Sequence, residues 1–300
     1  MWWSRRVPPP GPLRLLHDTI YHHSRANPAP AYMERREPFI KPLPIWRKTR
    51  MCIMAMAWDA HPRWRLILIG NRDELHARAA APLARWEQAD HLIAGRDLLS
   101  GGTWLGVSEQ GRAAIVTNLR GYGGPDPDRA SRGALVTDLL SGDETAPLRD
   151  FNPFNLILID RDRALFLTNR PHLLRTELTP GLYGLSNGTL DAPWPKTLAL
   201  KSALLDWLVA GAEDPLTLFG ALRAESLPHA GIAPDAPSDI PAEAMISPIF
   251  IRNPVYGTRC STIVAVDARG QGVISERRFD PDGVQTGETR LAFKWDEMGE

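Results

Sequence analysis

The residue with the clearest chemical potential is Cys52, which directly follows Met51. If Met51 is removed, Cys52 gains a free α-amino group with a pKa of about 7.7–8.0, so a useful fraction of that amine is neutral at pH 7. The amine can take the thiol proton, directly or through one water, which places nucleophile and base in one residue. The alternative is that Cys52 is a small buried hydrophobic residue at the start of a strand.

A second group is the tetrapeptide Asn71-Arg72-Asp73-Glu74, which follows the apolar run 65–70. Arg72 can hold a thiolate or a substrate carboxylate, because its guanidinium donates charge-assisted hydrogen bonds. Asp73 can accept a hydrogen bond from the α-amine and orient it. The competing interpretation is a solvated loop at a strand end.

Two asparagines end other strand-like runs, Asn118 and Asn187. Neutral amide donors suit an oxyanion hole because they point at developing negative charge without ionising, although asparagine also favours turns. Arg259 can anchor an anionic group or be a plain surface arginine. Cys260 precedes an apolar strand, so we expect it to be buried, slow to react and turned away from any site that Arg259 faces.

The elements that must position these residues come mostly in hairpins. Alternation and apolar runs predict strand pairs at 52–58 with 65–70, 101–107 with 113–118, 154–159 with 164–168, and 263–266 with 273–279, plus a strand at 181–187. Helical periodicity covers 195–210, with shorter helices at 133–140 and 216–222 and a proline-rich loop at 224–241. This order predicts antiparallel sheets with helices segregated to a face, an α+β layered domain.

Composition narrows the function classes. The chain has 300 residues with 43% hydrophobic and 23% charged residues and no formal net charge, which favours neither nucleic acid nor an anionic surface as a partner. Two cysteines cannot form a disulfide framework, so we expect a reducing, cytoplasmic location. The apolar runs are too short to span a bilayer. The histidines lack metal-ligand spacing, so we expect no metal.

The first fifty residues differ from the rest of the chain. They carry ten Lys/Arg against three Asp/Glu and nine prolines. Proline at this density removes backbone donors and stops helices, so no packed element is expected in 1–50. A targeting segment or a disordered tail are two interpretations. The third, which we favour, is that 1–50 is absent from the mature protein and that the functional domain is 51–300.

Ten motifs, taken in order, make residues 51 to about 294 resemble the NRDE family, also called the transport and Golgi organization family. They are Met51-Cys52, Asn71–Glu74, Ala94–Asp97, Gly101–Gly106, Thr117-Asn118, Ser131–Gly133, Phe154-Asn155, Leu185–Asn187, Trp194–Lys196 and Tyr256–Arg259. Members of this family start at the Met-Cys pair. The resemblance implies an N-terminal-nucleophile (Ntn) hydrolase-like fold, with four αββα layers and two stacked antiparallel sheets. It also draws Asn71, Glu74, Arg96 and Trp104 into the set of substrate-binding or structural residues, with Trp104 as a buried aromatic anchor beside paired glycines.

The layout also resembles the penicillin V acylase and bile salt hydrolase group of Ntn hydrolases. The resemblance implies that Cys52, Arg72, Asp73, Asn118, Asn187 and Arg259 fill that group's catalytic places. One departure is that Arg72 and Asp73 are adjacent here, whereas that group spaces the two residues apart. Neighbours on a strand point to opposite faces, so both reach the nucleophile only if the backbone has already turned.

Two functions follow from these resemblances. The first is a hydrolase or acyltransferase acting on a linear amide or acyl substrate, with Cys52 as nucleophile, the asparagines as oxyanion donors and no cofactor. In that case the amine and the arginines should depress the pKa of the Cys52 thiol. The second is a trafficking-related carrier of haem or of acyl-CoA or another lipid, in which a thiol can ligate haem iron. Only the enzyme needs the free α-amine and the oxyanion asparagines.

Overall fold

The computed structural model describes residues 52–123, 125–227 and 247–295. The leader 1–50, Met51 and most of the loop expected at 224–241 lie outside the described residues. No helix among those described is long and apolar enough to cross a bilayer.

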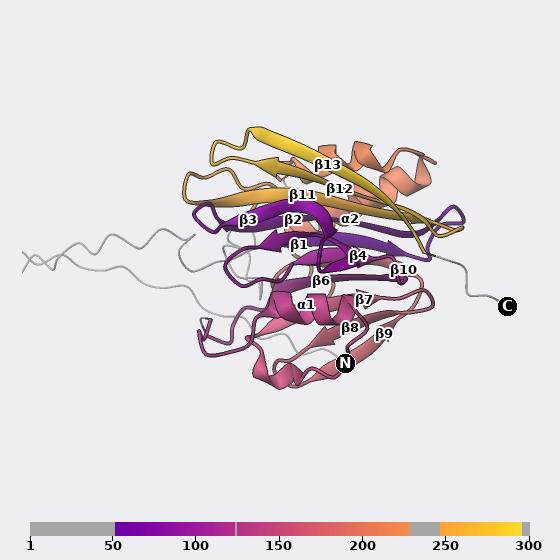
Figure 1. The fold of residues 1–300 in the computed structure, drawn as a ribbon. Coiled ribbons are helices and arrows are strands. Elements are labelled where there is room, and N and C mark those ends of the chain that lie inside the picture. Colours follow the sequence, from indigo (N-terminus) through magenta and orange to yellow (C-terminus); the bar gives the residue numbers. More distant parts are fainter. Residues whose placement is uncertain (1–51, 124, 228–246, 296–300) are drawn as a thin grey trace, which may run out of the picture. The chain divides into compact units, whose positions relative to one another are not determined.

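Two antiparallel sheets build the domain (Figure 1). The six-stranded sheet has the order β10-β1-β2-β11-β12-β13, with bounds Gly181–Leu185, Ile53–Trp58, Trp64–Leu75, Tyr256–Asp267, Gln271–Phe279 and Gln285–Lys294. The seven-stranded sheet runs in sequence order from β3 to β9, with bounds Ala80–Trp86, Ala89–Asp97, Leu105–Ser108, Arg112–Asn118, Phe154–Ile159, Ala164–Thr168 and Leu174–Leu178.

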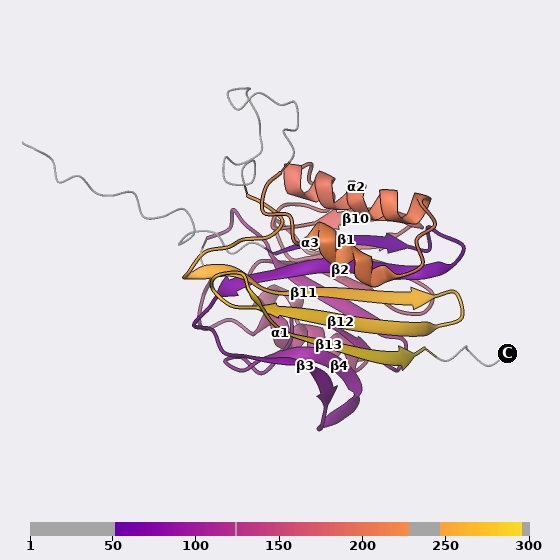
Figure 2. The same ribbon diagram turned by 90° about the horizontal axis from the view of Figure 1, so that it is seen from above.

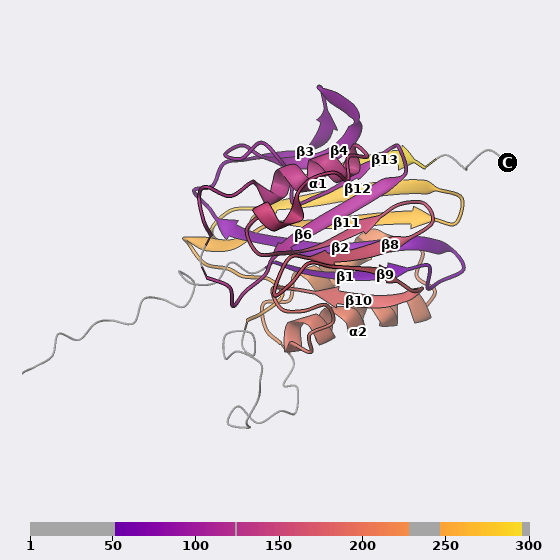
Figure 3. The ribbon, with the colours of Figure 1, turned by 90° about the horizontal axis from the view of Figure 1, so that it is seen from below.

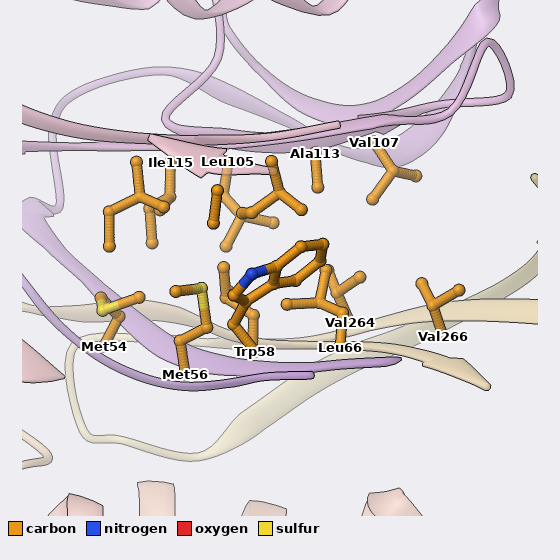
Figure 4. Close-up of a cluster of buried hydrophobic side chains, with 14 of the residues drawn as sticks. Met54, Met56, Trp58, Leu66, Leu105, Val107, Ala113, Ile115, Val264 and Val266 are labelled. Atoms are coloured by element: carbon orange, nitrogen blue, oxygen red, sulfur yellow. The ribbon is translucent and has the colours of Figure 1, made fainter. Parts of the chain in front are cut away.

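Strand β1 shows why the sheets stack. All six of its residues are buried, because both of its faces are covered. The alternation of side chains sends Met54 and Met56 into the layer between the sheets, where they meet residues such as Ile115 of β6 (Figure 4). Ile53 and Ala55 point the other way, into a second cluster formed with the helices. Apolar burial on both faces therefore fixes the sheet in the interior.

Helices cover the two outer faces. Figure 2 shows α2 (Pro195–Val209) and α3 (Phe219–Leu222) over the six-stranded sheet, with η3 (Pro215–Leu218) beside them. Figure 3 shows α1 (Arg132–Leu140) against the seven-stranded sheet, where a third apolar cluster forms. The short 3-10 turn η2 (Leu148–Asp150) precedes β7. The predicted four-layer αββα arrangement with two stacked antiparallel sheets is confirmed.

The structure corrects two expectations at strand ends. Strand β2 continues through Asn71-Arg72-Asp73-Glu74 to Leu75, so the tetrapeptide is not a solvated loop. Asn71, Asp73 and Glu74 are buried. Strand β11 starts at Tyr256, well before the predicted 263, and pairs with this end of β2. Long pairing of β2 with β11 explains both differences, because each strand satisfies the other's backbone groups.

Candidate active site

Antiparallel pairing brings the start of β1, the end of β2 and the start of β11 to the same end of the six-stranded sheet. A cavity of about 590 Å³ opens there between the two sheets. Residues singled out from the sequence that line it are Cys52, Arg72, Asp73, Glu74, Arg96, Trp104, Asn118 and Arg259. Of the described residues in that set, Asn71 and Asn187 lie outside the lining.

Cys52 lies just ahead of β1 and is 9% exposed. Its carbonyl accepts a hydrogen bond of 2.6 Å from Ser186 Oγ, and its Sγ is 4.0 Å from the carbonyl oxygen of Asp73. Burial, followed by the charge of Asp73, raises the pKa of the Cys52 thiol to about 12, although Arg72 acts in the opposite direction. The thiol of the full chain is thus protonated at neutral pH. The depressed pKa was predicted for the processed protein, in which Met51 is removed and the free α-amine lies beside the thiol.

Arg72 points into the cavity and has a partner that sequence reasoning missed. Its Nη2 lies 3.0 Å from Asp97 Oδ2, at the end of β4. Arg78 binds the same carboxylate oxygen. Burial alone would raise the pKa of Asp97, but the hydrogen bonds and charges of the two arginines hold it below its ordinary value. The sequence marks Asp97 only as part of the motif Ala94–Asp97, which does not indicate that Arg72 is its partner.

Asp73 points to the other face of β2. Its Oδ1 accepts a 2.6 Å hydrogen bond from Thr258 Oγ1, on the opposite residue of β11. Its Oδ2 is buried and has no hydrogen-bond partner among the described residues. Burial raises the pKa of Asp73, and the charge of Lys196 offsets part of that rise. Because β2 does not turn between Arg72 and Asp73, the two side chains approach the start of β1 from opposite sides.

Asn71 lies two residues before Asp73 on the same face, and all of its polar atoms are engaged. Its Nδ2 donates to the carbonyls of Leu222 and Ile249, at 2.9 and 2.8 Å. Its Oδ1 accepts from Ser261 Oγ at 2.7 Å. Asn71 therefore ties β2 to the helix layer.

The two asparagines proposed as oxyanion donors have different surroundings. Asn118 lines the cavity and is partly exposed. Asn187 is fully buried, and its Nδ2 donates to the Asn118 carbonyl at 2.7 Å. Its own carbonyl accepts from the backbone of Arg120. Asn187 thus holds the backbone of Asn118 in place. Because the Asn187 Nδ2 carries two hydrogens, one of them remains to donate to another group.

A β-bulge changes the expected positions of Arg259 and Cys260. The pairing of β11 with β2 shifts between Thr258 and Cys260, so Arg259 is the extra residue. Both Arg259 and Cys260 consequently line the cavity, whereas simple alternation would have turned one of them away. Arg259 Nη1 donates to three carbonyls, those of Leu75, His76 and Arg78. Burial raises the pKa of Cys260 well above its ordinary value.

Arg96, Trp104 and Gly133, from three other motifs, also line the cavity. Gly101 has a φ of 79°, and a Cβ on Gly102 would lie 2.1 Å from the carbonyl carbon of Gly133. Only glycines permit this approach to the start of α1. Trp104 packs against the core between the sheets, and the guanidinium of Arg96 lies 4.6 Å from the centre of the Trp86 ring.

One residue near the site was absent from our candidates. Lys196, in the first turn of α2, is 0% exposed, and its charge acts on Asp73. Burial lowers its pKa, and Asp73 offsets part of that shift. A signal existed, because Lys196 stands four and eight residues before Leu200 and Leu204 on the apolar stripe of α2.

Comparisons with known proteins agree with the sequence motifs. A family model described as Transport and Golgi organisation 2 matches residues 51–281. The Transport and Golgi organization protein 2 homologs of Bos taurus and Homo sapiens are 33% and 32% identical over 258 and 271 residues, covering 76% and 80% of this chain and 92% and 97% of the relatives. The Drosophila melanogaster protein is 27% identical over 271 residues, covering 78% of this chain and 95% of the relative.

Solved structures include two hydrolases. An N-acylethanolamine-hydrolyzing acid amidase ortholog of Caenorhabditis elegans has a TM-score of 0.43 at 12% identity, covering 71% of this chain and 92% of its own. A mutant conjugated bile acid hydrolase of Clostridium perfringens has a TM-score of 0.41 at 8% identity, covering 83% and 99%. The family model and the relatives, which span most of the domain, show that this chain belongs to the Transport and Golgi organisation 2 family.

Proposed function

We propose that the protein is an N-terminal cysteine hydrolase or acyltransferase acting on a linear amide or acyl substrate, with Cys52 as the first residue of the active form. The observation that supports this most strongly is Asp73 Oδ2, a buried carboxylate oxygen near Cys52 that has no hydrogen-bond donor among the described residues. A buried polar atom without a partner is costly. The α-ammonium or amine of a processed Cys52 is a donor that would complete it.

The reaction would proceed in two steps, acylation of Cys52 and release of the acyl group. The α-amine takes the thiol proton while Sγ attacks the carbonyl carbon, which gives a tetrahedral oxyanion facing Asn118. The C–N bond then breaks, the departing amine takes the proton from the α-ammonium, and a thioester remains on Cys52. Water or a second amine, deprotonated by the α-amine, attacks the thioester and releases the acyl product with the free thiol.

The cavity's charge favours a substrate that carries a negatively charged group. Seven arginines line it against four acidic residues; the arginines are Arg72, Arg78, Arg96, Arg129, Arg132, Arg259 and Arg278, and the acidic residues are Asp73, Glu74, Asp97 and Glu276. Asp97 and Glu276 are already paired with arginines. The excess of positive charge would attract an acidic group by electrostatics.

The carrier of haem, acyl-CoA or another lipid remains the competing function, and one observation favours it. With Met51 attached, burial raises the pKa of the Cys52 thiol, and the free α-amine that would serve as its base is absent. The same arginines would suit the acidic groups of such a cargo.

The test uses a chain that starts at Met51, with removal of Met51 verified by intact mass. The processed protein should release 4-nitroaniline from N-acyl 4-nitroanilides and should carry an acyl group on Cys52 when 4-nitrophenyl acetate is supplied. Cys52→Ala is the matched control, and Cys260→Ala should still be acylated. Equal acylation of a protein that retains Met51, or acylation that persists in Cys52→Ala, would contradict the proposal.

A further inference from the structure

Lys196 is a buried lysine in an unfavourable position. Its side chain is 0% exposed, although lysine ordinarily extends its ammonium into water. Its Nζ has no hydrogen-bond partner among the described residues, and the ring of Trp194 lies 6.0 Å away. Lys196 also follows Pro195, the first residue of α2, where the positive end of the helix dipole repels a cation.

These penalties are hard to explain by packing. A methionine has about the same length and would fill the same space on the apolar stripe of α2 without burying a charge. Fully buried lysines occur almost only where a partner compensates them. The position therefore calls for a charge partner close by.

Asp73 is that partner. It is 3% exposed, and it is the group whose charge does most to keep Lys196 protonated. Lys196 in turn does most to keep Asp73 ionised. Thr258 holds one carboxylate oxygen of Asp73, while Oδ2 and the lysine Nζ both lack a hydrogen-bond partner among the described residues. The two charges thus compensate each other beside the start of β1 without forming a hydrogen bond.

We propose that Lys196 is a positioning residue, whose buried ammonium holds the Asp73 carboxylate ionised while keeping the α-amine of Cys52 neutral. The inference rests on the proposed function, because it assigns a task to that amine. A lone Asp73 carboxylate would stabilise the protonated α-ammonium and remove the base. The charge of Lys196 offsets this attraction, so the amine can both bind Asp73 and accept the thiol proton. The other charged groups around this set are Arg72 and Glu74 beside Asp73 and Arg120 beside Lys196.

The proposal predicts a shift in the pH profile of Cys52. In the processed protein, the rate of Cys52 alkylation by iodoacetamide should rise with pH through the pKa of the α-amine. Lys196→Met should move the midpoint of that rise upward by about one pH unit, which corresponds to an about tenfold slower reaction below the midpoint. Lys201→Met is the matched control, because Lys201 lies on the same helix but pairs with Asp191 away from the cavity. It should leave the midpoint unchanged.

The variant Asp73→Asn/Lys196→Met completes the test. If Lys196 acts through Asp73, adding Lys196→Met to Asp73→Asn should not move the midpoint further. The proposal would be overturned if Lys196→Met left the midpoint unchanged, or if it moved the midpoint equally in the wild-type and Asp73→Asn proteins. If Lys196→Met alone does not fold, Asp73→Asn should restore folding, because the uncompensated carboxylate is gone; failure to restore it would also overturn the proposal.

A further arm separates this proposal from the proposed function. Acetylating the α-amine of the processed wild-type protein should abolish the pH-dependent rise. If the rise survives, the proposed function fails. The coupling between Lys196 and Asp73 would then still be measured by a double-mutant cycle on the unfolding midpoint in denaturant, which does not depend on catalysis.

Discussion

The two faces of β2 at its last residues differ in how their polar groups are satisfied. On the cavity side, Arg72 pairs with Asp97 of β4, and both sheets supply charged groups. On the opposite face, Asn71 uses every polar atom, whereas one oxygen of Asp73, which also lines the cavity, has no donor among the described residues. Residues two apart on one strand face thus have different tasks. Complete satisfaction marks Asn71 as structural, and the incomplete shell of Asp73 marks the place where a group can still be added.

The largest effect should appear on the cavity side, at Asn118. Asn118→Ala in the processed protein should lower turnover of N-acyl 4-nitroanilides by roughly 10²–10³-fold, the usual loss when one oxyanion donor is removed. Stability should change little because Asn118 is partly exposed. Steady-state kinetics and chemical denaturation together check this.

Asn187→Ala provides the contrast to Asn118→Ala. Asn187 is 0% exposed and its amide binds the Asn118 carbonyl, so its loss should lower the free energy of unfolding by about 1–3 kcal/mol. A stable Asn187→Ala protein with a selective loss of turnover would instead make Asn187 a direct oxyanion donor.

The contacts between β2 and the helix layer can be removed by substituting Asn71. Asn71→Ala should lower the free energy of unfolding by about 2–3 kcal/mol, because it leaves the Leu222 and Ile249 carbonyls without their donor. The alkylation rate of Cys52 in the protein that remains folded should stay within about threefold of wild type. This is well below the about tenfold change that a pKa shift of one pH unit causes. A large, selective loss of reactivity in this variant would remove the distinction between Asn71 and Asp73.

The pH dependence of stability sharpens the comparison further. Burial raises the pKa of Asp73 from 3.8 to about 7, so the folded protein binds a proton that the unfolded chain releases between these values. The contribution to stability is therefore complete below pH 3.8 and is lost as pH rises through about 7. Denaturant titrations at pH 4.5 and 7.5 should show this fall in wild type, and Asp73→Asn should reduce it. An equal fall in Asp73→Asn would assign it to other groups.

The smallest effect is expected at the second thiol. Cys260 lines the cavity but is 7% exposed and has a raised pKa, so it should alkylate slowly at neutral pH. Cys260→Ala should leave the amount of adduct on Cys52 unchanged, as read by peptide mapping. Comparable labelling of the two cysteines in wild type would contradict the proposed difference.

Much of the fold could be predicted from the sequence because its central strands are apolar on both faces. Strands β1, β7 and β8 are buried throughout, β2 is buried from Leu66 to Asn71, and buried leucines recur along α2. Strands β3, β4, β9 and β13 escaped prediction. Most side chains of β3, β9 and β13 are exposed or half-buried, so their sequences resemble loops, and the buried run of β4 is only Leu92 to Ala94. Pairing with neighbouring strands, rather than apolar burial, holds them in place.

The cavity lining could be predicted in part, and its details depend on tertiary structure. Arg72, Asn118 and Arg259 do line one cavity with Cys52. The ion pair with Asp97 and the bulge at Arg259 depend on long-range register, which no local pattern in the sequence encodes. The sequence marks Lys196 only as the last residue of the motif Trp194–Lys196 and as a cation on the apolar stripe of α2, and its role required the position of Asp73.

The central claim is that the α-amine of Cys52 is the missing donor to Asp73 and the base for the thiol. The direct measurement compares iodoacetamide labelling at neutral pH of the full chain, the processed protein and the processed protein with an acetylated α-amine, with adducts mapped to Cys52 or Cys260. The account predicts rapid labelling of Cys52 only in the processed protein with a free amine. Equal labelling of Cys52 in all three proteins would contradict it.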